Sequence, residues 1–406
     1  MHLHNSSTSS SNTRSPSNQS SVATREGSQE INLPPSRSKK TVGSVLKTGV
    51  YALLSLVTLD IAINAFFRYP TDPQNVNPGS LNLYFDYGRS LEGKVFRQLG
   101  KTNQESAPIA QAGWIENQLT QDEPVKPKAG IDLPVVIYGM SFSSHVGEAL
   151  QKLDPKVTTR LIAGPYAPPS HSFAAYQRDR SRRQAKVVIF GILASSVQGL
   201  DSMTGITLGG EVPAPYTFPQ YDLVAGKLKA IDPKIQTLAQ LRSARDNPAQ
   251  WQAFEDQLAE RDRFYDPLTF QQNPIDQSAI LRMARRAWAR THREQVVKSI
   301  HTKDGFNPRW HQLPVLQHMV EEFAAQAKQE GALPIVLLIQ DQGYDDHLYQ
   351  VLQPTLKRAD IPYVSTHGIA AAGDRQNFVA DGHFTEAANR KITVAVLGLI
   401  NQRLGR

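Results

Sequence analysis

Five short strand-like runs, most of them apolar, constrain the fold of this chain more than any other feature of its sequence. They are rich in β-branched residues, and the first three end at a glycine, as buried strands often do. The runs lie at residues 134–138, 158–163, 186–190, 334–340 and 361–364, with helix-like segments between them. Because strands that alternate with helices pair in parallel and are covered on both faces, the pattern predicts a three-layer α/β/α domain with a mostly parallel five-stranded sheet.

The chain before the first strand divides by composition. Residues 1–43 are rich in Ser, Asn and Thr and poor in large apolar groups, which predicts a disordered tail. Residues 44–68 then hold an almost wholly apolar run of about twenty residues, the length that spans a bilayer core. Basic residues precede this run, so the positive-inside tendency places the tail in the cytoplasm and the later residues outside the cell membrane. A cleaved signal peptide and a buried soluble helix are the alternatives.

One carboxylate, that of Asp60, stands inside the apolar run. A carboxylate at mid-membrane is costly unless it is protonated, paired or close to the interface. After the run, the Pro-, Asn- and Gln-rich residues 69–130 are expected to form a spacer with a short amphipathic helix near residues 84–99. Residues 131–406 are expected to be the α/β domain, with a largely helical insertion at about 200–330 between the third and fourth strands.

Charge and cysteine content limit the partners. The formal net charge is +7, and the chain has no Cys, which excludes disulfides and thiolate metal sites. No metal and no cofactor is expected, since the acidic and histidine residues at 341–347 have no distinctive ligand spacing. Basic and apolar residues alternate at 278–300, typical of a helix that contacts an acidic polymer or anionic lipid. An exposed helix face is the alternative, and no motif indicates nucleic acid.

Ser141 stands where the first strand ends and a helix-like segment begins. At such a turn the hydroxyl projects from the carboxyl edge of the sheet, where open α/β sheets bind their ligands. The backbone N–H groups that open the helix point at whatever this hydroxyl attacks. The position therefore suits a nucleophile, although a structural serine at a turn is the alternative.

A base and a carboxylate follow near the C-terminus. A nucleophilic serine needs a base to accept its proton, and the base needs a carboxylate to orient it. Asp381 and His383 supply both types, separated by one glycine, in a loop before the last helix-like run at 386–400. A loop at this point can lean over the sheet edge that carries Ser141.

With these motifs the chain resembles the SGNH or GDSL-like hydrolases, in their membrane-associated esterase and O-acyltransferase branch. The resemblance covers roughly residue 133 to the C-terminus. It rests on Gly139-Met140-Ser141 after the first strand, Gly164 after the second, Gly191 after the third and Asp381-Gly382-His383-Phe384 before the last helix. Met140 replaces the usual Asp of the first motif, and Asp381 and His383 are one residue apart instead of the usual two.

The resemblance implies a role for each residue. Ser141 would be the nucleophile, His383 its base and Asp381 the carboxylate that orients the base. The N–H groups of Phe142 and Gly164 would receive the oxyanion. Gly191 and Ser195 would belong to the oxyanion or substrate-binding region, because the Asn that the family usually supplies after the third strand is absent, with Leu193 in that segment.

These observations predict a serine-dependent acyl-ester hydrolase, anchored by a single membrane span, that acts outside the cytoplasmic membrane on an acyl ester or an acylated polysaccharide. The alternatives are an O-acetyl- or O-acyltransferase that modifies a cell-surface polysaccharide, and a catalytically degenerate carbohydrate-binding protein, which the missing Asn favours. A basic adaptor that docks through residues 278–300 is a further alternative.

Overall fold

The structure, a computed structural model, describes residues 39–75, 80–101, 103–121, 133–180 and 184–406. The backbone divides into two compact units, Met1–Ser55 and Leu56–Arg406. The tail expected at residues 1–43 lies outside the described residues up to residue 38, and so does the end of the expected spacer, from residue 122 onwards.

The second unit is built on one five-stranded sheet in which every pairing is parallel. In spatial order its strands are β2 (Val157–Ala163), β1 (Leu133–Gly139), β3 (Val187–Leu193), β8 (Leu333–Ile339) and β9 (Tyr363–Ser365). The three central strands are buried almost throughout, as expected of parallel strands covered on both faces. The predicted α/β class is confirmed, with five parallel strands close to the predicted positions.

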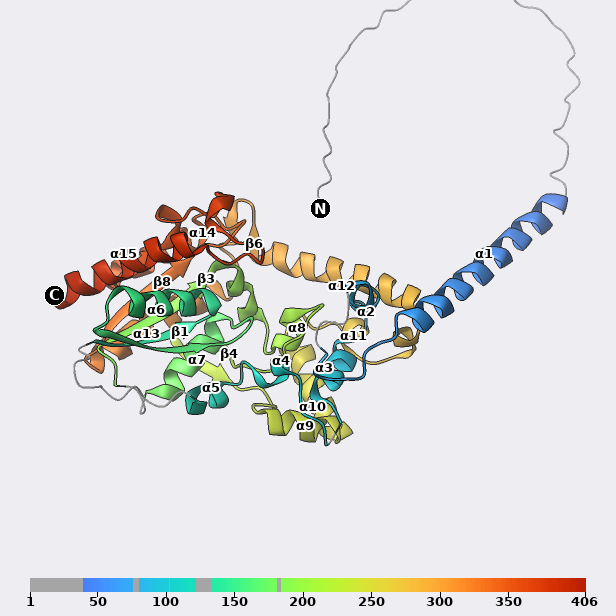
Figure 1. Cartoon of the computed structure of the whole chain (residues 1–406), viewed down its shortest axis with the longest axis horizontal. Coiled ribbons are helices and arrows are strands. Elements are labelled where there is room, and N and C mark those ends of the chain that lie inside the picture. Colours follow the sequence, from blue (N-terminus) through green and yellow to red (C-terminus); the bar gives the residue numbers. More distant parts are fainter. Residues whose placement is uncertain (1–38, 76–79, 102, 122–132, 181–183) are drawn as a thin grey trace, which may run out of the picture. The chain divides into compact units, whose positions relative to one another are not determined.

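Helices cover both faces of this sheet (Figure 1). On one face, α6 (Ser141–Leu153) and α15 (Glu386–Leu404) bury Val146, Ile392 and Val396 against strand side chains. On the other face, α7 (Pro169–Asp179), α13 (Leu313–Gln329) and α14 (His347–Arg358) form the larger apolar cluster. The two clusters are the two interfaces of a three-layer α/β/α arrangement.

The third strand is longer than the sequence pattern indicates, and this corrects the position of Gly191. The strand was expected to end at residue 190, with Gly191 at the edge, but β3 continues to Leu193 and Gly191 is buried inside it. A Cβ on Gly191 would lie 2.0 Å from Ser143 Oγ. The glycine therefore permits α6 to approach the sheet closely, and it does not form a turn.

The predicted insertion separates β3 from β8 and is mostly helical. Its elements are η1 (Ala194–Asp201), α8 (Gly205–Gly209), β4 (Gln220–Val224), β5 (Lys227–Ile231), α9 (Leu238–Arg245), α10 (Pro248–Arg261), α11 (Pro267–Phe270), η2 (Pro274–Gln277), α12 (Ala279–Ile300), β6 (His301–Thr302) and β7 (Gly305–Phe306). Strands β4 and β5, and strands β6 and β7, form two short antiparallel hairpins.

The expected spacer is wrong for most of its length, because the described residues between 80 and 121 fold into the domain. They form α2 (Ser80–Asp86), α3 (Leu91–Leu99), α4 (Pro108–Gln111) and α5 (Ile115–Gln121). Val95, Leu99 and Trp114 are buried in the larger apolar cluster. Leu91, Val95 and Leu99 recur every fourth position and form one buried stripe, so the amphipathic helix expected near residues 84–99 is present as α3 but packs into the domain.

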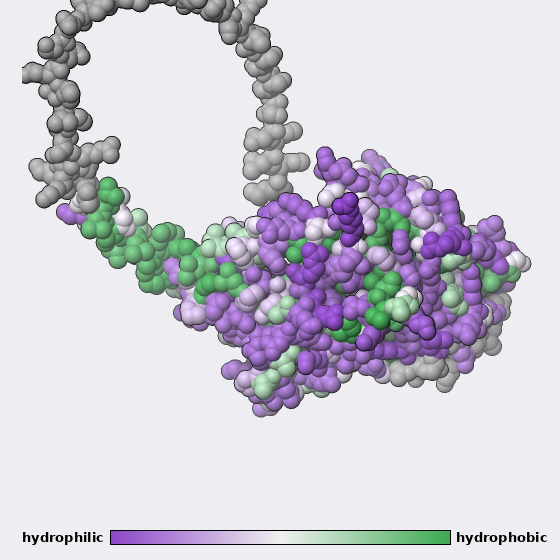
Figure 2. Space-filling view, turned by 180° about the vertical axis from the view of Figure 1, so that it is seen from behind, coloured by the Kyte–Doolittle hydropathy of each residue, from purple (hydrophilic) through white to green (hydrophobic). Residues whose placement is uncertain are grey.

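The apolar run near the N-terminus is helical. It lies in α1 (Lys39–Phe66), and within the described residues Gly43–Phe66 is the one stretch long and apolar enough to cross a membrane. Its large apolar side chains are exposed, and Figure 2 shows them as a continuous apolar surface.

Asp60 has polar partners at the start of α12. Its Oδ1 accepts hydrogen bonds from the hydroxyl of Ser278 and from the N–H of Ile280, each at 2.9 Å. One turn further along α1, Asn64 donates to the carbonyl of Gln277. A carboxylate at a helix N-terminus satisfies free N–H groups and complements the helix dipole. The last two turns of α1 therefore belong to the folded domain.

Candidate active site

Ser141 opens helix α6 directly after strand β1. The N–H groups of Ser143 and Ser144 donate to the carbonyl of Met140 at 2.9 and 3.1 Å and begin the helical hydrogen bonding. The N–H groups of Ser141 and Phe142 precede these first bonds, so they lie at the positive end of the helix dipole. An anion that forms beside the Ser141 hydroxyl would meet these donors.

Three predicted side chains meet in one hydrogen-bonded chain. Ser141 Oγ lies 2.7 Å from His383 Nε2, although 242 positions separate the two residues. On the other side of the imidazole, His383 Nδ1 lies 3.1 Å from Asp381 Oδ1. A proton on Nδ1 leaves Nε2 free to accept the Ser141 proton, which is the arrangement that a serine nucleophile requires.

The loop that carries Asp381 and His383 is held by its own hydrogen bonds. Asp381 Oδ1 also accepts the backbone N–H of His383 at 3.0 Å. The N–H of Val379 donates to the carbonyl of His383 at 2.8 Å, and Gly382 takes a φ of +90° in the turn between them. Because glycine adopts this φ without strain, the one-residue spacing places both functional groups on the same side of a tight turn.

Aromatic rings fix the plane of the His383 imidazole. The ring of Phe142 stacks on it with centroids 4.7 Å apart and planes 28° apart, and Phe384 packs edge-on against Phe142. His145, one turn along α6 from Ser141, places its ring 5.1 Å from that of His383. The sequence contained no specific signal for this neighbour beyond its position on the same helix face.

The carboxylate end of the arrangement is open to water. The side chain of Asp381 is 68% exposed, against 28% for His383. Hydrogen bonds from the backbone N–H and then the ring of His383 lower the pKa of Asp381 below its usual value. Asp381 is therefore ionised at neutral pH and can stabilise a positive charge on the imidazole.

Gly164 occupies the corresponding position on the neighbouring strand. Ala163 pairs with Gly139, so Gly164 leaves the sheet at the level where Met140 does. Its carbonyl accepts the N–H of Ala167, and a Cβ placed on it would lie 3.3 Å from Gln118, Gly113 and His171 atoms. Gly164 thus follows its strand as expected, in a turn crowded on the side of α7.

Ser195 is engaged by a carboxylate that the sequence reasoning did not assign. Its backbone N–H donates to Asp341 Oδ1 at 3.1 Å, and its side chain hydrogen-bonds the same carboxylate. Asp341 follows β8, and burial raises its pKa. Both donors of Ser195 therefore contact Asp341, which ties the ends of β3 and β8 together, and its role in oxyanion or substrate binding stays a prediction.

Histidines also meet beside the sheet edge. His301 Nε2 lies 2.9 Å from His347 Nδ1, and burial, followed by the charge of His347, lowers the pKa of His301 to about 4. Among the residues that the structure describes, no group of three or more His, Asp or Glu side chains is placed to hold a metal ion.

Comparison with known proteins adds two likenesses in structure. No protein-family model matches the chain, and no curated protein matches it. A candidate acylhydrolase from Bacteroides fragilis is similar, with 10% identity and a TM-score of 0.32, over 72% of this chain and 95% of that one. A GDSL-like lipase from Bacteroides thetaiotaomicron has 9% identity and a TM-score of 0.32, over 71% of this chain and 96% of that one. Sequence identities and TM-scores this low give no information about a reaction of this protein.

Proposed function

We propose that this protein is a serine-dependent hydrolase of acyl esters. The observation that carries the proposal is the continuous contact from Ser141 Oγ through the His383 imidazole to Asp381, at 2.7 and 3.1 Å. Three residue types that are needed together for nucleophilic acyl transfer meet at the carboxyl edge of a parallel sheet, although nothing in the core requires them there.

In the proposed reaction, Ser141 Oγ attacks the ester carbonyl while His383 Nε2 accepts its proton. The carbonyl oxygen becomes an oxyanion, which the N–H groups of Phe142 and Gly164 would receive. Collapse of this intermediate breaks the bond to the alcohol, and the alcohol leaves with the proton from His383. Water then repeats the sequence on the acyl-enzyme and releases the acid, while the negative charge of Asp381 stabilises each imidazolium.

Transfer of the acyl group to a sugar hydroxyl is the second candidate function. It needs the same acyl-enzyme, with a hydroxyl in place of water. Tyr166 and Pro165, which follow Gly164, each line a cavity with room for part of an extended acceptor, and this favours it. Mass spectrometry of an oligosaccharide incubated with the enzyme and an acyl donor would separate the two outcomes.

We also propose that α1 anchors the protein in a membrane, with the domain on the extracytoplasmic side. The apolar stretch Gly43–Phe66 and the basic residues before it support this. The contacts of Asp60 with α12 also support it, because the carboxylate that would be costly in a bilayer has polar partners in the domain. Protease protection in sealed spheroplasts and inside-out vesicles tests it: cleavage of the domain in inside-out vesicles alone would reverse the orientation.

The esterase test uses the full chain in detergent, since Asp60 and Asn64 belong to the domain. Hydrolysis of p-nitrophenyl acetate is measured for the parent protein and for Ser141→Ala, His383→Ala and Ser144→Ala. The last variant removes a hydroxyl from the same helix and serves as the control. We expect the first two to lose about 10³-fold or more in kcat/KM and the control to retain activity.

A fluorophosphonate reagent supplies a second readout, because it labels an activated serine and needs no acyl acceptor. We expect one adduct, on Ser141, which His383→Ala reduces. Hydrolysis or labelling that survives in Ser141→Ala would refute the site, and a folded parent protein that neither hydrolyses esters nor takes the label would refute the serine mechanism.

A further inference from the structure

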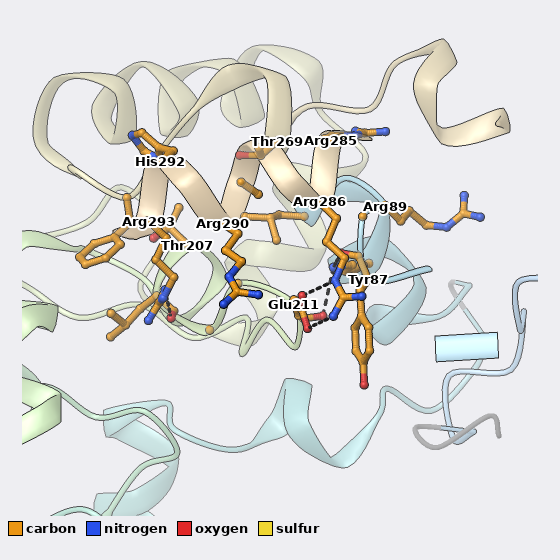
Figure 3. Close-up of a pocket in the computed structure, with 18 of the residues that line it drawn as sticks. Tyr87, Arg89, Thr207, Glu211, Thr269, Arg285, Arg286, Arg290, His292 and Arg293 are labelled. Carbon is orange, nitrogen blue, oxygen red and sulfur yellow. Dashed lines mark hydrogen bonds and ion pairs between the residues drawn. The ribbon is translucent and has the colours of Figure 1, made fainter. Parts of the chain in front are cut away.

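A cavity of about 500 Å³ lies between α12, the segment that follows α8 and the start of α3. Six cationic side chains line it: Arg89, Lys94, Arg285, Arg286, Arg290 and Arg293. One carboxylate, that of Glu211, stands against them. Figure 3 shows Arg286, Arg290 and Arg293 extending from α12 towards the loop that carries Glu211.

The carboxylate of Glu211 forms an ion pair with one of these cations. Arg286 Nε and Nη2 contact the two oxygens of Glu211 at 2.5 and 3.2 Å, and the same guanidinium lies over the ring of Tyr87. Arg290 contacts Glu294 on the exposed side of the helix. Arg89 pairs with Asp86 at 2.9 Å, and Arg285 pairs with Asp276, so four of the six cations have a carboxylate partner.

Two cations of the wall, Lys94 and Arg293, pair with no carboxylate among the described residues. The Lys94 ammonium is buried and donates to the carbonyls of Tyr87 and Glu211 at 2.6 and 3.0 Å. Arg293 is half-buried and donates to the carbonyl of Leu208 at 2.8 Å. Carbonyl dipoles satisfy donors without cancelling the charge, and burial accordingly lowers the pKa of Lys94 to about 7.

Arg285 is the most deeply buried cation of the wall. Its side chain is buried and contacts Asp276 through Nη2 at 2.7 Å. Its Nε and Nη1 groups are also buried, and they have no hydrogen-bond acceptor among the described residues.

A second cavity of about 650 Å³ lies beside the first, and the two have Tyr87, Lys94 and Glu211 in common in their walls. The second cavity adds one cation, Arg97, one carboxylate, Asp86, and Pro165 to the lining. We call these two neighbouring cavities together the trough. Cations are spread along it, an arrangement that suits a linear chain of repeated charges better than a single small anion. The rings of Tyr87, Tyr166 and Phe264 add flat apolar surfaces of the kind on which sugar rings pack.

We propose that this trough binds a linear polysaccharide that carries carboxylate groups. Arginine guanidinium groups bind carboxylates through paired hydrogen bonds, and the aromatic walls contact the sugar faces. Tyr166 and Pro165 belong to the turn that Gly164 begins, so the bound chain passes the proposed oxyanion turn. The inference deepens the proposed function by naming the class of polymer whose esters or hydroxyls would reach Ser141.

The test measures binding of hexagalacturonate, with neutral maltohexaose as the reference, by calorimetry on the full-length Ser141→Ala protein in detergent. This background removes catalysis, so failure to bind is distinguishable from failure to hydrolyse esters. We expect hexagalacturonate to bind and maltohexaose to bind at least tenfold more weakly. The affinity for hexagalacturonate should fall as salt rises, because the contacts are ionic.

Arg293→Gln is the decisive variant, and Lys298→Gln is its control. Glutamine keeps a donor for the Leu208 carbonyl but removes the charge, and we expect the affinity to fall about ten- to hundredfold. Lys298 lies on the same helix, is 73% exposed and does not line the trough, so its loss should change the affinity less than twofold. Arg290→Gln gives a second test. The side chain of Arg290 is 82% exposed, so its replacement should not affect folding.

Three outcomes would overturn the proposal. The first is no binding of hexagalacturonate by the folded protein. The second is an equal loss of affinity in Arg293→Gln and Lys298→Gln, which would indicate unspecific charge attraction. The third is binding of phosphatidylglycerol vesicles, but not hexagalacturonate, that Arg293→Gln abolishes, since the trough would then serve a lipid headgroup.

Discussion

The close approach of α6 to the sheet predicts how the position of the nucleophile can be disturbed. Ser143 lies two residues after Ser141, and its side chain fits over Gly139 and Gly191. A methyl group on Gly191 would lie 2.0 Å from Ser143 Oγ and 2.9 Å from Ser143 Cβ, and the next atom is at 3.6 Å. Ordinary contacts need about 3.5 Å or more, so Gly191→Ala must displace the start of α6 by roughly 1 Å.

Two consequences follow from this displacement. Overpacking of this kind costs about 1–3 kcal/mol of unfolding free energy. A shift of about 1 Å at the nucleophile costs about 10²-fold in rate, because the reacting atoms no longer align. Ser143 Oγ is buried without a hydrogen-bond partner among the described residues, so its removal sacrifices no interaction that holds α6 in place.

The assay is a graded series of variants. Gly191→Ala is combined with Ser143→Ala, which leaves the 2.9 Å contact, and with Ser143→Gly, which leaves only the contact at 3.6 Å. Urea unfolding and ester hydrolysis are measured for each single and double variant. We expect partial recovery of stability and rate with Ser143→Ala and fuller recovery with Ser143→Gly, although a glycine inside a helix costs about 1 kcal/mol by itself. Purely additive effects would refute the argument, because they would show that the two side chains do not compete for this space.

Three further predictions concern other parts of the domain. Asp381→Asn should reduce kcat less than Ser141→Ala does, because the carboxylate is exposed to water, and equal losses would contradict this. Arg160→Met should lower the unfolding free energy in urea by about 3–5 kcal/mol, because it leaves the buried Asp179 carboxylate without its cation, whereas the double variant Arg160→Met/Asp179→Leu should cost less. Burial lowers the pKa of His171 to about 4, so the unfolded chain binds a proton below pH 6.5 that the folded one refuses. The parent protein should therefore lose about 3 kcal/mol more than His171→Gln between pH 7 and pH 4, and equal losses in the two proteins would refute the assignment.

One short turn connects the proposed active site to the trough. Gly164 begins this turn, and Pro165 and Tyr166 reach the two cavities. The hydroxyl of Tyr216 donates to the carbonyl of Pro165. Tyr166 adopts a backbone φ of +56°, which residues other than glycine rarely adopt. A polymer that presses on Tyr166 would therefore act on the same turn that carries a proposed oxyanion donor.

The sequence by itself determined the local features of this protein. Apolar runs of four to seven residues predict buried strands, because a strand covered on both faces has no polar side. The position of Ser141 follows from the same pattern, since a helix begins where the first run ends. The short Asp381–His383 spacing also acts locally, because the turn closes through hydrogen bonds between neighbours.

Only the tertiary structure decided which distant segments meet. The hydrophobic periodicity of a sequence indicates which residues are buried, but it does not indicate which residues they pack against. For this reason the contact between Ser141 and His383, the packing of Gly191 on Ser143 and the engagement of Ser195 by Asp341 were not derivable from spacing. The packing of the described residues between 80 and 121 against the domain depends on the same kind of long-range contact. Asp60 is the clearest case. The apolar sequence around it shows that burying its carboxylate in a membrane would be unfavourable. The hydrogen bonds that stabilise this carboxylate come from the N-terminus of a helix more than two hundred residues away.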